Sequence, residues 1–213
     1  LNIHTIILAG GKGTRMLSQK AKVLQALGGK TMLNHVMKAA NKISNKISVV
    51  VGFDKEGVEE EIKKIGINAN TFLQKEQIGT ADAVKTTLKD IDKNEKILIL
   101  YGDVPLINEE TLKKLCNQES DLSILTTNLE NPTGYGRTLK DKENNVLGII
   151  EEKDADSEQK KIKEIFTGIL VAKGSVLKKY IPEINNNNSA KEFYLTDLIG
   201  IAHKNGFKIN TLS

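Results

Sequence analysis

A glycine-rich loop with two basic residues follows the first apolar run of the chain. The run is Ile3–Ala9, and the loop reads Leu8-Ala9-Gly10-Gly11-Lys12-Gly13-Thr14-Arg15-Met16. Glycine has no Cβ, so successive backbone N–H groups can point at one anion, and Lys12 and Arg15 add positive charge. A P-loop needs Ser or Thr after Gly-Lys, and the dinucleotide fingerprint needs Gly where Met16 stands. The loop therefore predicts a polyphosphate site of another type, with a tight turn as the structural alternative.

Two charged residues further along the chain could complete such a site. Lys22 is close enough in sequence to fold back over the same phosphates, and its alternative is an ordinary solvated lysine. Asp103 follows a predicted buried strand, and open α/β sheets bind ligands at the carboxyl ends of strands. Magnesium is bound by one or two carboxylates together with substrate phosphates, so Asp103 is a candidate metal ligand. The alternative is an aspartate that caps the following turn.

Alternating strands and helices must position these residues. Short apolar runs rich in β-branched residues predict buried strands at Ile3–Ala9, Ile47–Val51, Ile97–Tyr101, Leu122–Thr126 and Ile169–Val171. Apolar residues at helical spacing predict helices at Met32–Ala40, at Val58–Ile65 after the candidate N-cap Asp54, and at Leu112–Leu115 after Asn108. This alternation predicts a doubly wound, mostly parallel α/β sheet with right-handed crossovers, a Rossmann-like fold.

The second half of the chain has a different pattern. Antiparallel strands with polar connections are predicted at Gly134–Thr138, Val146–Ile150 and Phe166–Ala172, and a final strand at Phe207–Ile209. The longest connection is the charged stretch Glu151–Glu164. Because no linker separates two parts, residues 1–213 are predicted to form a single domain.

Composition excludes several classes of protein. The 213 residues are 39% hydrophobic and 27% charged, which excludes disorder and a disulfide scaffold. A net charge of +4 and 4% aromatic residues do not predict a nucleic-acid partner. No window approaches the roughly 18 apolar residues of a membrane-spanning helix, so no membrane association is expected. A single cysteine indicates a reducing compartment, and we expect a cytoplasmic protein.

The remaining candidates for chemistry have ordinary explanations. His4, His35 and His203 lack metal-ligand spacing and are expected to be surface or helix-face residues. Cys116 lies in an amphipathic segment and is expected to be a small buried hydrophobe. The charged stretch Lys160–Lys163 is expected to be a solvated face.

Several motifs, taken in order, resemble one enzyme family. They are Leu8–Met16, Lys22, Gln74-Lys75-Glu76-Gln77-Ile78-Gly79-Thr80-Ala81, Tyr101–Pro105, Gly134-Tyr135-Gly136-Arg137, Ile150–Ala155 and Glu192–Asp197. Together they are similar to the uridyltransferase domain of bacterial N-acetylglucosamine-1-phosphate uridyltransferase, in the sugar nucleotidyltransferase superfamily. The resemblance covers almost the whole chain. The first loop marks the superfamily, and Gln-x-x-Gln-x-Gly-Thr with Gly-Tyr-Gly-Arg marks this member.

The resemblance implies a reaction and a set of roles. UTP and N-acetylglucosamine 1-phosphate would form UDP-N-acetylglucosamine and pyrophosphate with Mg²⁺ as cofactor, through alignment and charge neutralisation and without a general base. The implied catalytic residues are Arg15 and Lys22, and the implied metal ligand is Asp103. The implied nucleotide- and sugar-binding residues are Leu8, Ala9, Gly10, Gly11, Gln74, Gly79, Thr80, Tyr101, Gly102, Gly136 and Glu151.

The sequence also departs from the family pattern. Phe166 precedes Thr167-Gly168 where the family has Asn, and Phe offers neither donor nor acceptor to a sugar. Asp82 follows Gly79-Thr80-Ala81 where the family often has His, and a carboxylate is favoured at a helix start. The alternatives are therefore the same chemistry on another sugar 1-phosphate, or a degenerate nucleotide-binding module without turnover.

The C-terminal parts of the family are missing from the sequence. In the family a second magnesium-binding Asn lies beyond the last strand, followed by a left-handed β-helix with acetyltransferase activity and trimer contacts, whereas this sequence stops at Ser213. Whether the chain was cut or the natural protein lacks these parts, we expect neither acetyltransferase activity nor a trimer built on that β-helix. A monomer is the favoured oligomeric state.

Overall fold

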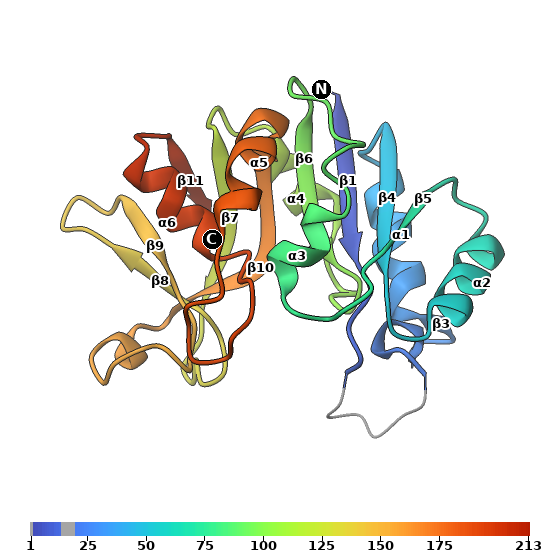
Figure 1. Ribbon diagram of the computed structural model, residues 1–213, viewed down its shortest axis with the longest axis horizontal. Helices are drawn as coiled ribbons and strands as arrows, with labels where there is room; N and C mark the ends of the chain where they lie inside the picture. The colour runs from blue at the N-terminus through green and yellow to red at the C-terminus, as the bar shows by residue number, and fades with distance from the viewer. Residues whose placement is uncertain (1, 14–19) are drawn as a thin grey trace.

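A mixed, mostly parallel β-sheet runs through the molecule and carries helices on both faces (Figure 1). The structure, a computed structural model, describes residues 2–13 and 20–213. Within these ranges nine strands form the main sheet: β1 (Ile3–Leu8), β4 (Lys46–Val51), β5 (Asn70–Leu73), β6 (Lys96–Tyr101), β7 (Leu122–Asn128), β8 (Arg137–Lys140), β9 (Val146–Ile150), β10 (Glu164–Lys173) and β11 (Ile209–Leu212). The predicted fold class is confirmed.

The order of the strands explains why the two halves of the sequence differ. The order is β11-β7-β10-β6-β1-β4-β5, in which β6, β1, β4 and β5 are parallel neighbours. Strand β10 runs antiparallel to both β6 and β7, while β8 pairs antiparallel with β10 and β9. These four parallel strands therefore come from the βαβ half of the chain. On the other side of the sheet, β10 introduces antiparallel pairing, and β11 joins at the edge, parallel to β7.

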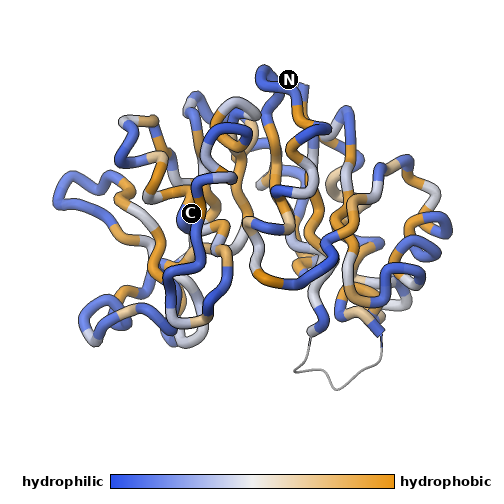
Figure 2. Tube along the Cα trace, viewed as in Figure 1, coloured by the Kyte–Doolittle hydropathy of each residue, from blue (hydrophilic) through white to orange (hydrophobic). Residues whose placement is uncertain are grey.

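Helices cover the sheet because its strands are apolar on both faces. One core cluster contains Ile6 and Leu8 of β1, and the other contains Ile7, as expected where side chains alternate along a strand. Figure 2 shows the apolar strands inside and the polar helix surfaces and loops outside. The described helices are α1 (Met32–Asn41), α2 (Lys55–Ile65), α3 (Thr80–Lys85), α4 (Glu109–Cys116), α5 (Gly174–Tyr180) and α6 (Asp197–Lys204), with short 3₁₀ turns η2 (Lys22–Leu24), η3 (Gln159–Lys161) and η4 (Ile181–Glu183) and a small hairpin β2 (Ala26–Leu27) and β3 (Lys30–Thr31). No helix within the described ranges is long and apolar enough to cross a membrane.

The two predicted N-caps behave differently. The side chain of Asn108 accepts a hydrogen bond from the Thr111 backbone N–H at the start of α4, so this cap is confirmed. Asp54 occupies the cap position of α2, but its side chain makes no capping hydrogen bond there. Its Oδ2 instead accepts from the Ala21 N–H at 3.0 Å. The carboxylate thus fastens the segment before η2 to the start of α2.

Two predicted strand boundaries are wrong by a few residues. Strand β8 begins at Arg137 because Gly134 has a φ of 89° and the Tyr135 N–H bonds back to Pro132 O in a turn. Strand β11 begins at Ile209 because the Phe207 N–H donates to Ala202 O and closes the end of α6. In both places a local turn takes the backbone donors that a ladder would need.

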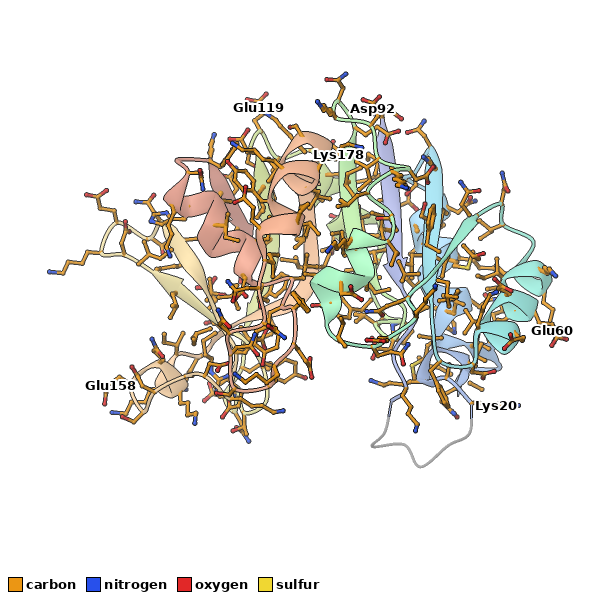
Figure 3. The ribbon with its side chains drawn as sticks, viewed as in Figure 1. Lys20, Glu60, Asp92, Glu119, Glu158 and Lys178 are labelled. Atoms are coloured by element: carbon orange, nitrogen blue, oxygen red, sulfur yellow. The ribbon has the colours of Figure 1, made fainter. Side chains whose placement is uncertain are left out.

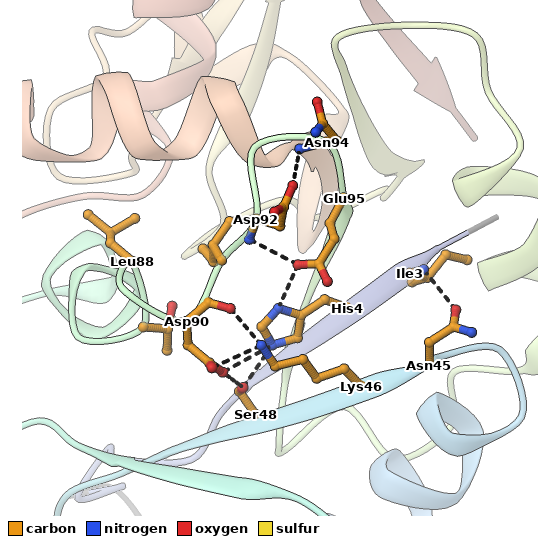
Figure 4. Close-up of polar contacts among 12 residues, drawn as sticks. Ile3, His4, Asn45, Lys46, Ser48, Leu88, Asp90, Asp92, Asn94 and Glu95 are labelled. Atoms are coloured by element: carbon orange, nitrogen blue, oxygen red, sulfur yellow. Dashed lines mark hydrogen bonds and ion pairs between the residues drawn. The ribbon is translucent and has the colours of Figure 1, made fainter.

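His4 is not the surface residue that its spacing predicted. It lies on β1 with no exposed surface, and its Nε2 is 2.7 Å from Ser48 Oγ (Figure 4). Asp90 Oδ2 lies 3.9 Å from Nε2, and Glu95 Oε2 lies 3.5 Å from Nδ1. Lys46 Nζ lies 2.9 Å from the other oxygen of Asp90. Burial, together with the nearby Lys46 charge, lowers the pKa of His4 despite the two carboxylates.

Cys116 and the charged stretch follow the sequence-based expectations. The Cys116 thiol is fully buried in α4, and burial raises its pKa to about 11. Lys160, Lys161 and Lys163 are exposed. Neither group lies at the cavity described below.

The lowered pKa of His4 predicts a pH-dependent stability. The folded state favours neutral His4, because the pKa of His4 is lower in the folded than in the unfolded chain. The folded state therefore has its full stability above the ordinary histidine pKa of about 6.5 and loses stability as the pH falls through the lower folded-state pKa. We expect the free energy of unfolding, measured by urea denaturation, to fall from about pH 7 to pH 5 more steeply in the wild type than in His4→Gln. The matched control His203→Gln, at an exposed position on α6, should keep the wild-type slope. Equal slopes for wild type and His4→Gln would contradict a buried, neutral His4.

Candidate functional site

A cavity of about 530 Å³ opens at the carboxyl ends of β1 and β6. Residues from the glycine-rich loop, η2, the turn before α3, the end of β6 and the C-terminal segment line it: Leu8, Ala9, Gly10, Gly11, Gly13, Lys22, Val23, Gln74, Gln77, Gly79, Thr80, Ala83, Tyr101, Asp103 and Glu192. Parallel strands end at the same edge of the sheet, so segments far apart in sequence meet there.

Most of the predicted site residues line the cavity. Those that line it are Leu8, Ala9, Gly10, Gly11, Lys22, Gln74, Gly79, Thr80, Tyr101 and Asp103. Gly102, Gly136 and Glu151 are not among its lining residues, and Arg15 lies outside the described residues. Gly102 nevertheless borders the site, because its N–H donates to Leu8 O at 2.9 Å and joins the end of β6 to the end of β1.

The glycine-rich loop stays close to the neighbouring strand. Gly10 O accepts from the Phe53 N–H at 3.0 Å, and a Cβ at Gly10 would lie 3.2 Å from Gln74 Oε1. Glycine at this position therefore lets the Gln74 amide reach the loop. Lys12, a predicted source of charge for the site, lies elsewhere: its Nζ is 5.6 Å from the centre of the Phe53 ring.

Lys22 and Asp103 form an ion pair inside the cavity, although they are 81 positions apart in the sequence. Lys22 Nζ lies 2.6 Å from Asp103 Oδ2, and the side chains are 38% and 27% exposed. Both groups are open to an incoming ligand, since neither is sealed in the core. The described residues include no group of three or more His, Cys, Asp or Glu that could hold a metal ion, and Asp103 is the carboxylate at the Lys22 end of the cavity.

The amide of Gln74 has a fixed orientation. Its Nε2 donates to Gly79 O at 3.0 Å and to Asp82 Oδ2 at 2.9 Å, which uses both amide hydrogens. Oε1 lies beside Gly10, and the described residues donate no hydrogen bond to it. Asp82, the departure from the family pattern, therefore helps to aim a carbonyl oxygen at the cavity.

The turn before α3 is fastened to the C-terminal segment. The Phe193 N–H donates to Ile78 O at 2.8 Å, and the Ala81 N–H donates to Phe193 O at 2.9 Å. Gly79 lies between these bonds with a φ of 138°, and a Cβ there would be 2.3 Å from Phe193 O. Only glycine fits this crossing of two backbones.

Apart from the residues that line the cavity, a second cluster of polar side chains surrounds Glu151, just after the end of β9. Thr196 Oγ1 donates to Glu151 Oε1 at 2.8 Å, and the same carboxylate lies against Gly136, where a Cβ would be 3.4 Å from Oε2. Burial raises the pKa of Glu151, and Asp154 and Glu192 raise it further. Burial, with Glu151 and Asp154 nearby, also raises the pKa of Asp197 to about 6. Gly136 and Glu151, which the resemblance assigns to the amino sugar, thus lie side by side, and their contact with a sugar stays a prediction.

Tyr101 is the last residue of β6. Its side chain lines the cavity and packs against Gly168, where a Cβ would be 2.9 Å from the ring. Burial raises the pKa of Tyr101 to about 12, with the neighbouring Thr80 side chain opposing and the Glu151 and Asp103 charges adding to the shift. The hydroxyl therefore stays protonated at neutral pH.

Sequence reasoning missed several lining residues, namely Gly13, Val23, Gln77, Ala83 and Glu192. Three of them had a signal, because Gly13 belongs to the glycine-rich loop, Gln77 is the second glutamine of Gln-x-x-Gln, and Glu192 begins the motif Glu192–Asp197. Ala83 follows Thr80 by three residues on α3, so helical spacing places both on one face. Val23 had no such signal.

Phe166 is part of the core and does not line the cavity. Its side chain is 6% exposed in the core cluster on the α3, α5 and α6 face of the sheet. Its backbone N–H donates to Gly136 O at 2.9 Å. The substitution thus leaves the backbone contact to Gly136 in place and removes a polar side chain from that neighbourhood.

An α/β sheet with a glycine-rich loop at the carboxyl end of its first strand is typical of nucleotide-binding proteins. Residues 5–158 match the model of the MobA-like NTP transferase domain. The chain belongs to this family of nucleotidyltransferases, which confirms the broader part of the sequence-based resemblance.

Two solved structures have the same fold. One is titled a putative glucose-1-phosphate thymidylyltransferase from Bacillus anthracis in complex with a sucrose, with a TM-score of 0.79, 21% identity, and coverage of 99% of this chain and 87% of that one. The other is titled UDP-glucose pyrophosphorylase complexed with UDP-glucose, with a TM-score of 0.80, 15% identity, and coverage of 99% and 90%. At these identities the likeness concerns the fold.

The close crossing at Gly79 predicts a large loss of stability for Gly79→Ala. The added methyl group would meet Phe193 O and force the two backbones apart, so we expect a loss of about 3 kcal/mol or more in the free energy of unfolding. The matched control is Gly66→Ala, which also has a positive φ but has no atom within 4 Å of its Cβ. It should cost only about 1–2 kcal/mol, the penalty of the left-handed backbone alone. Urea denaturation of both variants measures the difference, and equal losses would contradict the crossing.

Proposed function

We propose that the chain transfers a uridylyl group from UTP to N-acetylglucosamine 1-phosphate in the cytoplasm, forming UDP-N-acetylglucosamine and pyrophosphate. The observation that carries the proposal is that one cavity joins the glycine-rich loop, Gln74, Lys22, Tyr101 and Asp103. The NTP transferase family supports the nucleotide half of the reaction. The titles of the two structural neighbours name sugar phosphates or a sugar nucleotide, which supports the acceptor class.

Gln74 is the proposed reader of the nucleobase. Its two amide hydrogens bond to Gly79 O and Asp82, so its Oε1 can only accept a hydrogen bond. Uracil carries a donor at N3, whereas the corresponding nitrogen of cytosine is an acceptor. The fixed amide therefore favours UTP over CTP, because a cytosine would place two acceptors against each other.

Lys22 and Asp103 are the proposed contacts of the triphosphate end. An ammonium next to a carboxylate can turn toward phosphate oxygens, and the carboxylate then binds a cation. Asp103 fits Mg²⁺, because this ion usually takes one or two carboxylates and completes its octahedron with phosphates and water. When bound, Mg²⁺ would neutralise charge on the phosphates. Arg15 is proposed to add charge at the same end on sequence grounds alone.

The reaction requires alignment more than proton transfer. An oxygen of the sugar phosphate forms a bond to the α-phosphorus of UTP, and the bond from that phosphorus to the bridging oxygen breaks, so pyrophosphate leaves with the electron pair. The attacking oxygen is already ionised, which explains why the cavity needs no general base. The loop Leu8–Gly11 and Lys22 would hold the phosphates in line, and such positioning is a large part of catalysis.

Glu151 and Gly136 are the proposed contacts of the amino sugar. A carboxylate held by Thr196 can accept hydrogen bonds from sugar hydroxyls, and Gly136 leaves room beside it. The second candidate is the same reaction on another sugar 1-phosphate. It is favoured by Phe166, which places an apolar side chain in the core where the family has a polar one.

Pyrophosphate release tests the reaction and its acceptor. The protein is incubated with UTP and Mg²⁺ and with N-acetylglucosamine 1-phosphate, glucose 1-phosphate or no acceptor, and CTP replaces UTP in a parallel set. We expect release with UTP and the acetylated sugar, at least tenfold less with CTP, and none without an acceptor. Faster release with glucose 1-phosphate would establish the second candidate. Binding of UTP without release for either acceptor would indicate a degenerate module.

A variant of Asp103 tests the metal contact in the same assay. Asp103→Asn removes the charge at nearly constant shape, and we expect the rate to fall by roughly a hundredfold or more. The control Glu60→Gln makes the same change of charge on α2, where Figure 3 shows Glu60 on the outer surface, and should keep the wild-type rate. An unchanged rate for Asp103→Asn would remove Asp103 from the metal role.

A further inference from the structure

Residues 192–196, here called the C-terminal strap, connect the two ends of the site. The strap precedes α6 and lies against the turn that begins α3, more than a hundred residues earlier in the chain. Two backbone hydrogen bonds, Phe193 N–H to Ile78 O and Ala81 N–H to Phe193 O, hold it there. At its start Glu192 lines the cavity, and at its end Thr196 contacts Glu151.

The Thr80 side chain makes a third hydrogen bond between the turn and the strap. Thr80 Oγ1 accepts the Leu195 N–H at 3.0 Å, across 115 positions of sequence. Leu195 is fully buried, so its N–H cannot turn to water if this acceptor is removed. An unpaired buried donor is costly, and the strap would have to shift to relieve it.

The next residue along the strap, Thr196, connects the position of Leu195 to Glu151, the proposed contact of the sugar. Thr196 is 5% exposed, and its Oγ1 donates to Glu151 Oε1 at 2.8 Å. Only one peptide unit separates the donor that Thr80 fixes from the hydroxyl that holds Glu151. A shift of Leu195 therefore moves Thr196 with it, and the Glu151 carboxylate loses its partner.

We propose that Thr80 is a positioning residue for the sugar phosphate substrate: its hydroxyl fixes the strap, and the strap orients Glu151 through Thr196. The proposal rests on the proposed function, which places the sugar at Glu151. Thr80 also lines the cavity beside Tyr101, at the nucleotide end. The same side chain thus lines one subsite and holds the geometry of the other.

Titration calorimetry with two ligands separates these roles. UDP fills the nucleotide end alone, whereas UDP-N-acetylglucosamine reaches both ends, so the ratio of their dissociation constants reports on the acceptor side. Thr80→Val removes the acceptor oxygen at nearly constant volume, and Thr80→Ser keeps it. The matched control is Thr86→Val, at the end of α3, where the hydroxyl donates only to Ala83 O at 2.7 Å.

We expect Thr80→Val to weaken UDP-N-acetylglucosamine binding on the order of tenfold more than it weakens UDP binding. Thr80→Ser and Thr86→Val should bind both ligands as the wild type does. An equal loss for both ligands in Thr80→Val would make Thr80 a nucleotide contact only and overturn the proposal. The proposal would also be overturned if Thr80→Ser lost as much affinity for UDP-N-acetylglucosamine as Thr80→Val does. The same holds if the wild type bound UDP-N-acetylglucosamine no more tightly than UDP.

A second variant checks the path through the strap. Thr196→Val removes the hydroxyl that holds Glu151, and it should weaken sugar nucleotide binding without changing UDP binding. Because both variants interrupt the same path, the double variant should lose little more affinity for the sugar nucleotide than Thr80→Val alone. Additive losses of affinity would contradict the path.

Pyrophosphate release, measured separately, reports on the proposed function. A protein that shows this binding pattern without turnover would refute that function and leave the positioning role intact.

Discussion

The parallel pairing of β1 with both β4 and β6 is the constraint on which the site depends. All six residues of β1 are buried, and the strand forms ladders with both neighbours over most of its length. The ladders continue past its end, where the Ala9 N–H donates to Val50 O and the Gly102 N–H donates to Leu8 O. The glycine-rich loop and the segment with Asp103 are thereby fixed at one edge of the sheet.

The antiparallel strand β10 determines where the other half of the site lies. It pairs with β6 through Leu170–Lys173, and its register with β7 shifts between Phe166 and Leu170. Gly168 falls in this irregularity with a φ of 90°, and the ring of Tyr101 packs against it. Phe166, just before, bonds to the backbone of Gly136. Through this irregularity β10 therefore contacts both Tyr101, at the end of β6, and Gly136, just before β8.

The periodic elements could be predicted from the sequence because burial determines their pattern. Strands such as β6 are continuous apolar runs between polar turns, and α1, α2 and α4 follow apolar spacing. The Gly79-Thr80 turn could be predicted from its motif. His4 could not, because a polar residue inside an apolar strand gives no sign of the partners Ser48, Asp90 and Glu95 that come from other elements. The contact of Thr80 with Leu195 likewise depends on tertiary packing across the whole chain.

The proposed reaction is the transfer of the uridylyl group of UTP to a sugar phosphate. Phosphorus NMR of the wild-type protein with UTP, Mg²⁺ and N-acetylglucosamine 1-phosphate follows every phosphorus atom in one sample. We predict that the signals of a nucleotide diphosphate diester and of pyrophosphate rise together in equal amounts as those of UTP and the sugar phosphate fall. Pyrophosphate accompanied by UMP, or inorganic phosphate accompanied by UDP, would show hydrolysis by water and would contradict the central claim.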